Sequence, residues 1–463
     1  MALPRLDFGL SREERLPAIL LIVFFAALCF AGGASREDVL GQTVIRAVAI
    51  IVMLIHIVAG RLPRLGRYRT CSLLLGAMIA LPAIQLIPLP SAIWTALPGR
   101  ALIASSPLGA ASWRPLNMVP DAGWNSLFSL LVPLTVLVLL SSLETRTVRR
   151  TQYLVMGVAG FSAVVALLQA AGVAPDNPFI NGSTLDYAGV FANRNHQALL
   201  LSIGILVAWF WGFRHGNDIR DRRLWLALCI IVLFSISILV TGSRTGAIVG
   251  ILALVTGPLF AQSGRRDGGR GGRNRFFWLV VSLVLAVTVI TLSLYFGRAT
   301  SVDRVASLGL QTDFRLRAWP TVWRVAGTYF PFGAGMGTFD PVFRIAEPFG
   351  LLEPTYFNHA HNDFLETVIE TGIFGPIILL SSLIWFVRRV VALPTQSRDN
   401  ARMARLAALI IALTLIASLS DYAARTPMIM ALMVIAGCWL TGAPHDTGAT
   451  RSDDALPASG KYL

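Results

Sequence analysis

Apolar stretches of nearly membrane-spanning length recur along the whole of this sequence. A chain of 463 residues that is 55% hydrophobic and only 14% charged is too apolar for a water-soluble globule. A helix needs about 20 apolar residues to cross a hydrocarbon core roughly 30 Å thick. We therefore predict an all-α integral membrane protein with about twelve transmembrane helices. The predicted spans cover residues 16–33, 43–59, 71–89, 124–143, 153–173, 198–213, 224–240, 246–260, 276–295, 364–387, 406–419 and 428–440.

The positive charges predict how the chain is oriented in the membrane. Of the 39 lysines and arginines, 26 lie in one alternating set of loops and 12 in the other. Loops rich in these residues stay in the cytoplasm, so the richer set and both chain ends are predicted to be cytoplasmic. A net charge of +14 could indicate nucleic-acid binding in a soluble protein. Here the charge follows the loops between spans, and we expect no nucleic-acid partner.

The longest predicted external segment covers residues 297–359. Loops of such length are usually functional or disordered, and the many aromatic residues of this one argue against disorder. Residues 314–324 have a helical pattern that places two tryptophans opposite Arg317 and Arg324. Such a helix suits the membrane interface, with its arginines turned to phosphate. A helix that rests in the interface with snorkelling arginines and binds no ligand is an equally open alternative.

Glycines alternate further along this segment, at positions 333, 335 and 337. A nucleotide-binding loop is a poor interpretation, because no strand precedes the glycines and the segment faces away from cytoplasmic nucleotides. We expect the backbone here to approach a ligand or a neighbouring helix closely.

Polar residues are densest where the external segment re-enters the membrane. His361 there could accept a proton from a sugar hydroxyl, because imidazole titrates near neutral pH. Asp363, Glu366 and Glu370 recur at helical spacing on the next turns, where the helix dipole favours carboxylates. Glu370 should face the bundle interior, because a charge within the membrane is costly. His359 and His361 with Asp363 also fit a metal site, but we favour the base, since no further ligand cluster lies outside the membrane.

Two arginines lie at the external ends of predicted spans. Arg194 precedes the sixth span, and Arg244 lies in the tight turn between the seventh and the eighth. A diphosphate headgroup in the outer leaflet would explain both, through charge-assisted hydrogen bonds to the planar guanidinium groups. Contact with ordinary lipid headgroups, or capping of helices, is the alternative.

In this order, these elements resemble the O-antigen ligase and polymerase family of bacterial membrane glycosyltransferases. Residues 189–195 look like the Gly-x-Phe-x-Asn-x-Asn stretch of the family, and residues 242–246 look like its Ser-Arg-Gly-type turn. Residues 361–375 are similar to the His-Asn-x9-Gly-x-x-Gly signature of the ligases.

The long external segment resembles the family as well, through Arg315, Trp319, Pro331 and the spaced glycines that follow. The resemblance covers roughly residues 185–390 and implies a GT-C-like membrane fold with one long periplasmic loop. It implies N-terminal transmembrane helices at residues 1–175, an O-antigen ligase-like core at 176–390 that includes the periplasmic loop 297–360, C-terminal transmembrane helices at 391–442, and a cytoplasmic tail at 443–463.

The resemblance implies a reaction in the periplasmic leaflet of the inner membrane. A glycan would pass from undecaprenyl diphosphate to an acceptor hydroxyl of lipid A core, with no cofactor, metal or nucleotide sugar. Arg194 and Arg244 would bind the diphosphate, Arg315 would stabilise the growing negative charge, and His361 would act as the base. Candidates for supporting roles are His359, Asn362, Asp363, Arg317 and Asn195.

Two other functions remain open at this point. A polymerase of the same family would pass one growing glycan to the next repeat unit and would share all these motifs, although one dominant external loop favours a ligase. A polysaccharide or anion transporter should place ionisable residues near the midplane of several spans. Here such residues are few, so we rank transport behind glycosyl transfer.

Overall fold

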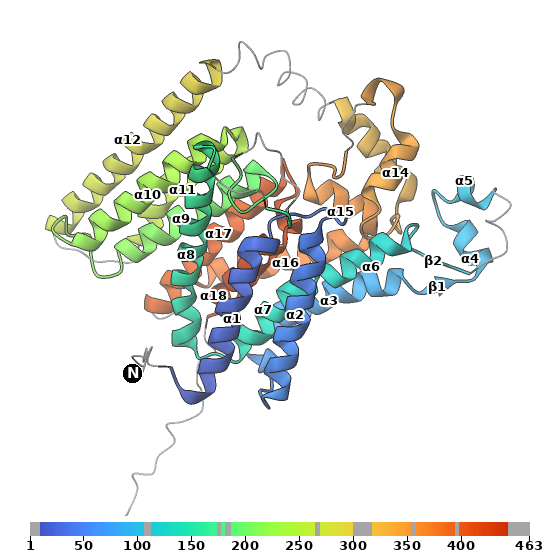
Figure 1. Cartoon of the computed structure of the whole chain (residues 1–463), viewed down its shortest axis with the longest axis horizontal. Helices are drawn as coiled ribbons and strands as arrows, with labels where there is room; N and C mark the ends of the chain where they lie inside the picture. Colours follow the sequence, from blue (N-terminus) through green and yellow to red (C-terminus); the bar gives the residue numbers. More distant parts are fainter. Residues whose placement is uncertain are drawn as a thin grey trace, which may run out of the picture.

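The computed structural model describes residues 10–105, 113–173, 177–180, 187–263, 269–299, 317–352, 357–393 and 398–442. In these residues the chain is a bundle of α-helices with one short antiparallel strand pair, β1 (Pro88–Leu89) and β2 (Arg114–Pro115) (Figure 1). The first helices are α1 (Arg12–Ala31), α2 (Leu40–Val58), η1 (Leu65–Tyr68), α3 (Arg69–Gln85), α4 (Ser91–Ala96), α5 (Ala101–Ala104), α6 (Pro120–Ser129), α7 (Leu131–Ser141) and α8 (Thr145–Ala170). The others are α9 (Arg194–Gly212), α10 (Arg222–Thr241), α11 (Arg244–Ala261), α12 (Gly269–Ala299), α14 (Phe339–Ala346), η2 (Phe349–Leu351), α15 (Asp363–Thr371), α16 (Phe374–Val391), α17 (Arg398–Ser418), η4 (Ala423–Arg425) and α18 (Pro427–Thr441).

Nine helical stretches of the described chain are long and apolar enough to cross a membrane. They are Arg12–Ala31, Leu40–Val58, Pro120–Ser141, Thr145–Ala170, Arg222–Thr241, Arg244–Ala261, Arg273–Leu292, Phe374–Val391 and Asn400–Ser418. Helices α3, α9 and α18 occupy the other three predicted segments. The all-α membrane class is confirmed, whereas a total of twelve spans and the long periplasmic loop stay predictions.

Helix α9 lies at the centre of the bundle and packs against α8, α10, α11 and α17. Almost every side chain from His196 to Gly212 is buried, which is expected of a helix that is apolar on all sides. Trp209 stacks on Phe213 at a centroid distance of 5.5 Å and meets the edge of Trp278 of α12. This core fixes the N-terminal end of α9, which belongs to the candidate site.

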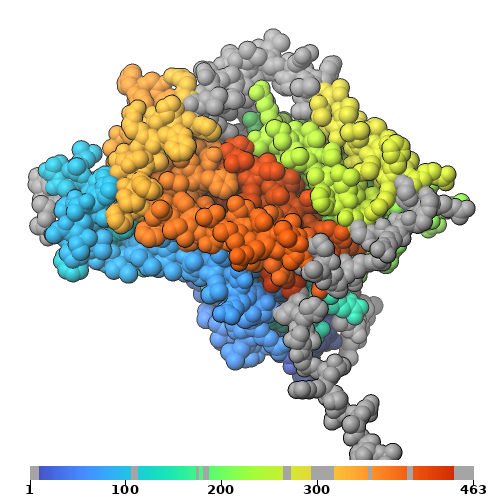
Figure 2. All heavy atoms as spheres, turned by 180° about the vertical axis from the view of Figure 1, so that it is seen from behind, coloured from blue at the N-terminus to red at the C-terminus, as the bar shows by residue number. Residues whose placement is uncertain are grey.

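Helix α16, by contrast, lies at the periphery of the bundle. Its apolar side chains Ile377, Leu380 and Leu383 are about half exposed, and the surface of this part of the chain is visible from behind in Figure 2. An apolar helix with so little protein cover suits contact with lipid chains.

The predicted single helix over residues 364–387 is wrong, because the structure divides it into α15 and α16. Gly372 ends α15 with φ of 59°, a value that side chains other than glycine rarely adopt. A Cβ at this position would lie 1.9 Å from the carbonyl oxygen of Pro331. The external loop therefore approaches the chain at the point where the helix breaks.

The alternating glycines make the close backbone approach that their spacing predicts. The amides of Ala334 and Gly335 donate to the carbonyls of Ile369 and Glu370, both at 2.9 Å. The amide of Ile373 donates in the other direction, to Pro331 at 2.9 Å. The partner is the last turn of α15, so this part of the prediction, a neighbouring helix, is confirmed.

Two buried side chains from the N-terminal third of the chain form hydrogen bonds to the same loop. Arg100 is fully buried and donates to the carbonyls of Gly333 at 3.1 Å and Leu116 at 2.8 Å. Gln85 donates to the carbonyl of Glu370 at 3.0 Å and accepts from the amide of Met336 at 2.9 Å. Arg100 thus connects the loop to Leu116, and Gln85 connects it to the last turn of α15, so both buried side chains have hydrogen-bond partners.

Residues 317–329 form the expected helix, but its faces differ from the prediction. The buried side consists of Ala318, Thr321, Val322 and Val325. Trp323 is 62% exposed and Arg324 is exposed as well, so neither the tryptophan nor the arginine belongs to the buried side, and their placement at the membrane interface stays a prediction. The small side chains pack inward because the loop forms its own core at this end of the molecule.

Candidate functional site

Helix α15 begins the candidate site. Asn362 caps it, because its side chain accepts from the amide of Leu365 at 3.0 Å. His361 directly before it has φ of 50°, and it is the one described residue other than glycine with a positive φ. Histidine tolerates this region better than most residues, and such conformations gather at functional sites.

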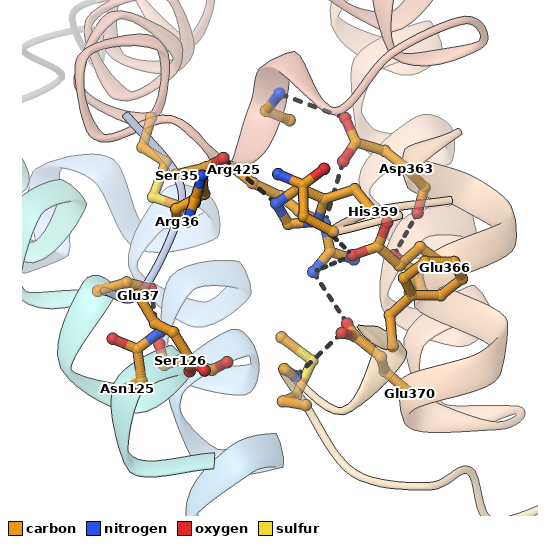
Figure 3. Close-up of a pocket in the computed structure, with 18 of the residues that line it drawn as sticks. Ser35, Arg36, Glu37, Asn125, Ser126, His359, Asp363, Glu366, Glu370 and Arg425 are labelled. Atoms are coloured by element: carbon orange, nitrogen blue, oxygen red, sulfur yellow. Dashed lines mark hydrogen bonds and ion pairs between the residues drawn. The ribbon is translucent and has the colours of Figure 1, made fainter. Parts of the chain in front are cut away.

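Three carboxylates of α15 share one guanidinium group, that of Arg425 in η4. Arg425 lies 3.2 Å from Asp363, 3.2 Å from Glu366 and 2.9 Å from Glu370 (Figure 3). Glu366 and Glu370 are fully buried. The expectation that Glu370 faces the interior is confirmed, and its ionic partner comes from the loop between the last two helices.

Three buried carboxylates compete for the charge of one arginine, and burial and the other carboxylates act against their ionised forms. Burial raises the pKa of Glu370 to about 7, against the attraction of Arg425. Burial acts on Glu366 in the same direction, but Arg425 and His359 outweigh it and lower the pKa of Glu366 to about 2. Helix α15 lies outside the nine membrane-spanning stretches. Glu370 is therefore more readily protonated than Glu366.

Both ring nitrogens of His359 have polar partners within the protein. Its Nδ1 lies 2.7 Å from Glu366, and its Nε2 lies 3.2 Å from the hydroxyl of Ser35 in the linker between α1 and α2. The other oxygen of Glu366 accepts from the amide of Ala360 at 2.7 Å. Glu366 thus fixes the orientation of the His359 ring, as a carboxylate partner commonly does for histidine.

The ring of Tyr422 lies among three histidine rings. The centroid distances are 4.1 Å to His359, 5.1 Å to His196 and 5.3 Å to His361. These residues come from the loop before α15, the first turn of α9 and the loop before η4. Three of the six histidines of the chain meet at one tyrosine.

Next to Tyr422, the buried carboxylate of Asp421 connects three of the four motifs singled out in the sequence. It accepts from the side-chain amides of Asn193 at 3.0 Å and Asn195 at 2.5 Å. It lies 3.5 Å from Nδ1 of His361. Asn195 in turn accepts from the hydroxyl of Ser243 at 2.6 Å. Residues 189–195, residues 242–246 and the histidine signature therefore meet around one carboxylate.

The two diphosphate candidates begin neighbouring helices. Arg194 is the first residue of α9 and is half-buried, and Arg244 is the first residue of α11 and is exposed. Gly242 ends α10 with φ of 63°, and Ser243 then caps α11. The N-terminal ends of helices attract anions, since their free amides and dipoles are positive. Two such ends and two arginines make this side of the site suitable for phosphate.

The remaining predicted residues are divided between the site and the loop. Asn195, Asn362 and Asp363 lie in the contacts just described. Arg317 is exposed and donates to the carbonyl of Gly350 at 2.9 Å, within the external loop. Arg315 falls outside the described residues.

Sequence reasoning missed Asp421, Tyr422 and Arg425. All three lie in the short connection between α17 and α18. Their signal in the sequence is a pair of opposite charges, Asp421 and Arg425, between two apolar helices, where each charge needs a partner. In the count of lysines and arginines, Arg425 is one of the 12 residues in the predicted external loops, and the count does not distinguish it from the others.

A cavity of about 350 Å³ opens beside His359. One wall is α15 with Asp363, Glu366 and Glu370; the opposite wall is formed by the α1–α2 linker, α2 and α6 (Figure 3). His361, Arg194 and Arg244 do not line it. The site thus has two sides, the helix ends near His361 and the cavity near His359, joined at Tyr422.

Residues 228–380 match the model of the O-antigen ligase family. Over this segment, about a third of its length, the chain is similar to that family. The family resemblance of the sequence motifs is confirmed, and the match supports an enzyme of the glycosyltransferase type that acts on lipid-linked glycans in a membrane.

The matched segment contains Arg244 and His361, but Arg194, Asp421 and Arg425 lie outside it. The candidate site is therefore completed by helices on both sides of the matched segment. No curated protein matches the chain.

Proposed function

We propose that the protein is an O-antigen ligase-type glycosyltransferase of the bacterial inner membrane. It would move a glycan from undecaprenyl diphosphate to a hydroxyl of lipid A core on the periplasmic side. The observation that supports this most is the meeting of His361, the start of α9 and the start of α11 around Asp421. A base and a phosphate-binding surface are the two parts that such a transfer needs.

In the proposed step, His361 accepts the proton of the acceptor hydroxyl. The oxygen attacks the anomeric carbon of the donor sugar, and the bond from this carbon to the diphosphate oxygen breaks. The electron pair leaves with undecaprenyl diphosphate, which gains one negative charge. Arg194, Arg244 and Arg315 would stabilise this charge, and Asp421 would stabilise the protonated imidazole 3.5 Å away. A second lipid-linked glycan in place of lipid A core would make the enzyme a polymerase.

Replacing Arg194 or Arg244 by lysine should lower kcat/KM about ten- to hundredfold. A hydrogen bond to a charged group contributes about 1.5–3 kcal/mol, and lysine cannot make the planar two-point contact with phosphate. Transfer would be measured with purified protein, lipid-linked donor and each acceptor in turn, which also separates ligase from polymerase. Arg114→Lys is the control, since Arg114 packs on Trp94 far along the chain from the helix ends. Full activity in both lysine variants would remove these arginines from the donor site.

The site should face the periplasm. Cysteines at Gly350 and Gly66 test this, because both glycines have open space for a side chain. Gly350 lies in the external loop, and Gly66 lies in a loop of the arginine-rich set. In cells with a permeabilised outer membrane, an impermeant thiol reagent should label Gly350→Cys, and should label Gly66→Cys only after lysis of the inner membrane. The reverse pattern would place the site in the cytoplasm and end the proposal.

A further inference from the structure

The cavity beside His359 is built differently from the helix ends that would receive a diphosphate. Six of its lining residues are acidic, Glu37, Asp38, Asp340, Asp363, Glu366 and Glu370. Only three are arginines: Arg36, Arg46 and Arg425. The formal charge of the lining is therefore negative, and a phosphate or a carboxylate would meet like charges there.

The arginines of the cavity are also already engaged. Arg425 is shared among the three carboxylates of α15, and Arg36 pairs with Asp38 at 2.5 Å. Arg46 donates to the amide oxygens of Gln42 at 3.0 Å and Asn125 at 2.6 Å. The charge of Arg46 also interacts with the carboxylate of Glu37, so each of the three arginines has an acidic group near it in the cavity. The acidic field also shows in Glu37, because burial, then Asp340 and Asp38, raise its pKa.

The rest of the lining suits a sugar. Neutral hydrogen-bonding side chains come from both walls: Ser35, Gln42, Asn125, Ser126, Ser129, Asn358 and Thr367. Carboxylates accept hydrogen bonds from hydroxyls or ammonium groups, and amides both donate and accept. Phe339 and Phe364 add apolar surface for the face of a sugar ring. A volume of about 350 Å³ is at the small end for ligand pockets, so it fits the end of a glycan and not a long chain.

The cavity lies next to the residues proposed for glycosyl transfer. His359 lines it, and the ring of His359 packs on Tyr422 at 4.1 Å. Tyr422 also contacts His361, at 5.3 Å. A sugar in the cavity would therefore lie against His359, which Tyr422 links to His361, and would not touch Arg194 or Arg244.

We propose that this cavity binds the acceptor, and that it selects a terminal sugar that is uncharged or bears an amine and rejects one that bears phosphate or carboxylate. This inference rests on the proposed glycosyl transfer. The acceptor sugar could belong to lipid A core or to a lipid-linked repeat unit, since both can end in such a sugar.

Binding can be tested without the donor. Purified protein in lipid nanodiscs would be titrated with methyl glucoside, methyl glucosaminide, methyl glucuronide and glucose 1-phosphate, with saturation-transfer NMR as the readout. The first two should bind, and the two anionic probes should bind at least about tenfold more weakly, since like charges brought together cost several kcal/mol. Equal binding of all four probes, or binding of none, would overturn the inference.

Two asparagine variants test whether the probe binds in this cavity. Asn358→Ala and Asn125→Ala should weaken binding of the neutral probe about three- to tenfold, as expected for one lost hydrogen bond. Asn400→Ala is the matched control, because Asn400 lines a separate small pocket beside Arg149 and Trp439. If both cavity variants bind the probe as the control does, the sugar binds elsewhere and the inference fails.

Transfer assays separate this inference from the proposed function. Asn358→Ala should raise KM for the acceptor and leave KM for the donor unchanged, and methyl glucoside should compete with the acceptor alone. Selective sugar binding in the cavity without transfer to either acceptor would end the proposed function and leave a sugar site. Transfer with an unchanged acceptor KM in Asn358→Ala would keep the function and end the inference.

Discussion

Replacing His361 by alanine is expected to lower glycosyl transfer about 10²–10⁴-fold while the protein stays folded. This is the usual contribution of a general base. The structure places Nδ1 of His361 near Asp421, which leaves Nε2 as the nitrogen that could accept the proton of an acceptor hydroxyl. Binding of the donor should change little, because Arg194 and Arg244 begin other helices.

The backbone at His361 complicates the alanine variant. Alanine with φ near 50° is strained, whereas asparagine tolerates this region and cannot act as a base. His361→Asn should therefore match His361→Ala in lost activity and exceed it in folded yield. His215→Ala is the control, since His215 is exposed in the turn after α9.

His359→Ala should be milder than His361→Ala. Both nitrogens of His359 already have partners, Glu366 and Ser35, so we expect a supporting role for this ring. A folded His361→Asn protein that transfers at the wild-type rate would exclude His361 as the base. If His359→Ala were inactive in the same assay, the base would be His359 with Glu366.

Replacing Arg425 by methionine should cost about 3–5 kcal/mol of the free energy of unfolding. This is the range for removal of one partner of a buried ion pair. The variant leaves Glu366 and Glu370 fully buried without their cation, within reach of Asp363. These carboxylates must then take up protons or repel one another, and both cost free energy.

Unfolding of the purified protein in detergent would measure this loss. Arg344→Ala is the control, because the exposed Arg344–Asp340 pair is expected to contribute about 0–1 kcal/mol. Adding Glu366→Gln and Glu370→Gln to Arg425→Met should recover part of the loss, since the buried charges are gone. Equal losses for Arg425→Met and Arg344→Ala would mean that the cluster does not hold α15 in place.

Residue types and spacing are sufficient to predict the helical membrane class and the family. Apolar spans depend on local sequence, and so do helix ends such as Ser243-Arg244 and His361-Asn362. Consecutive spans cross the membrane in alternating directions. The sequence alone therefore also predicts that Arg194, Arg244 and His361 lie on the same side of the membrane.

The partners of these residues could not be predicted in this way. Asp421 meets Asn195 and His361 across long stretches of chain, and no repeat or spacing in the sequence links them. The break at Gly372 was also missed, because its cause is the carbonyl of Pro331 and lies outside the helix. The burial of Thr321 could not be predicted for the same reason, since the packing of the loop determines which side of its helix is buried.

The shared carboxylate of Asp421 has a consequence for how this chain can be divided. It accepts hydrogen bonds from the start of α9, before the family-matched residues 228–380, and itself lies after them. Arg425 likewise neutralises α15 from beyond the end of that segment. An excised fragment of residues 228–380 would keep Glu366 and Glu370 but lose their counter-ion, and would keep His361 but lose its carboxylate. A working unit must therefore extend past both borders of the matched segment: through η4 at its C-terminal side, and at its N-terminal side through α9 to the α1–α2 linker, which forms part of the cavity wall.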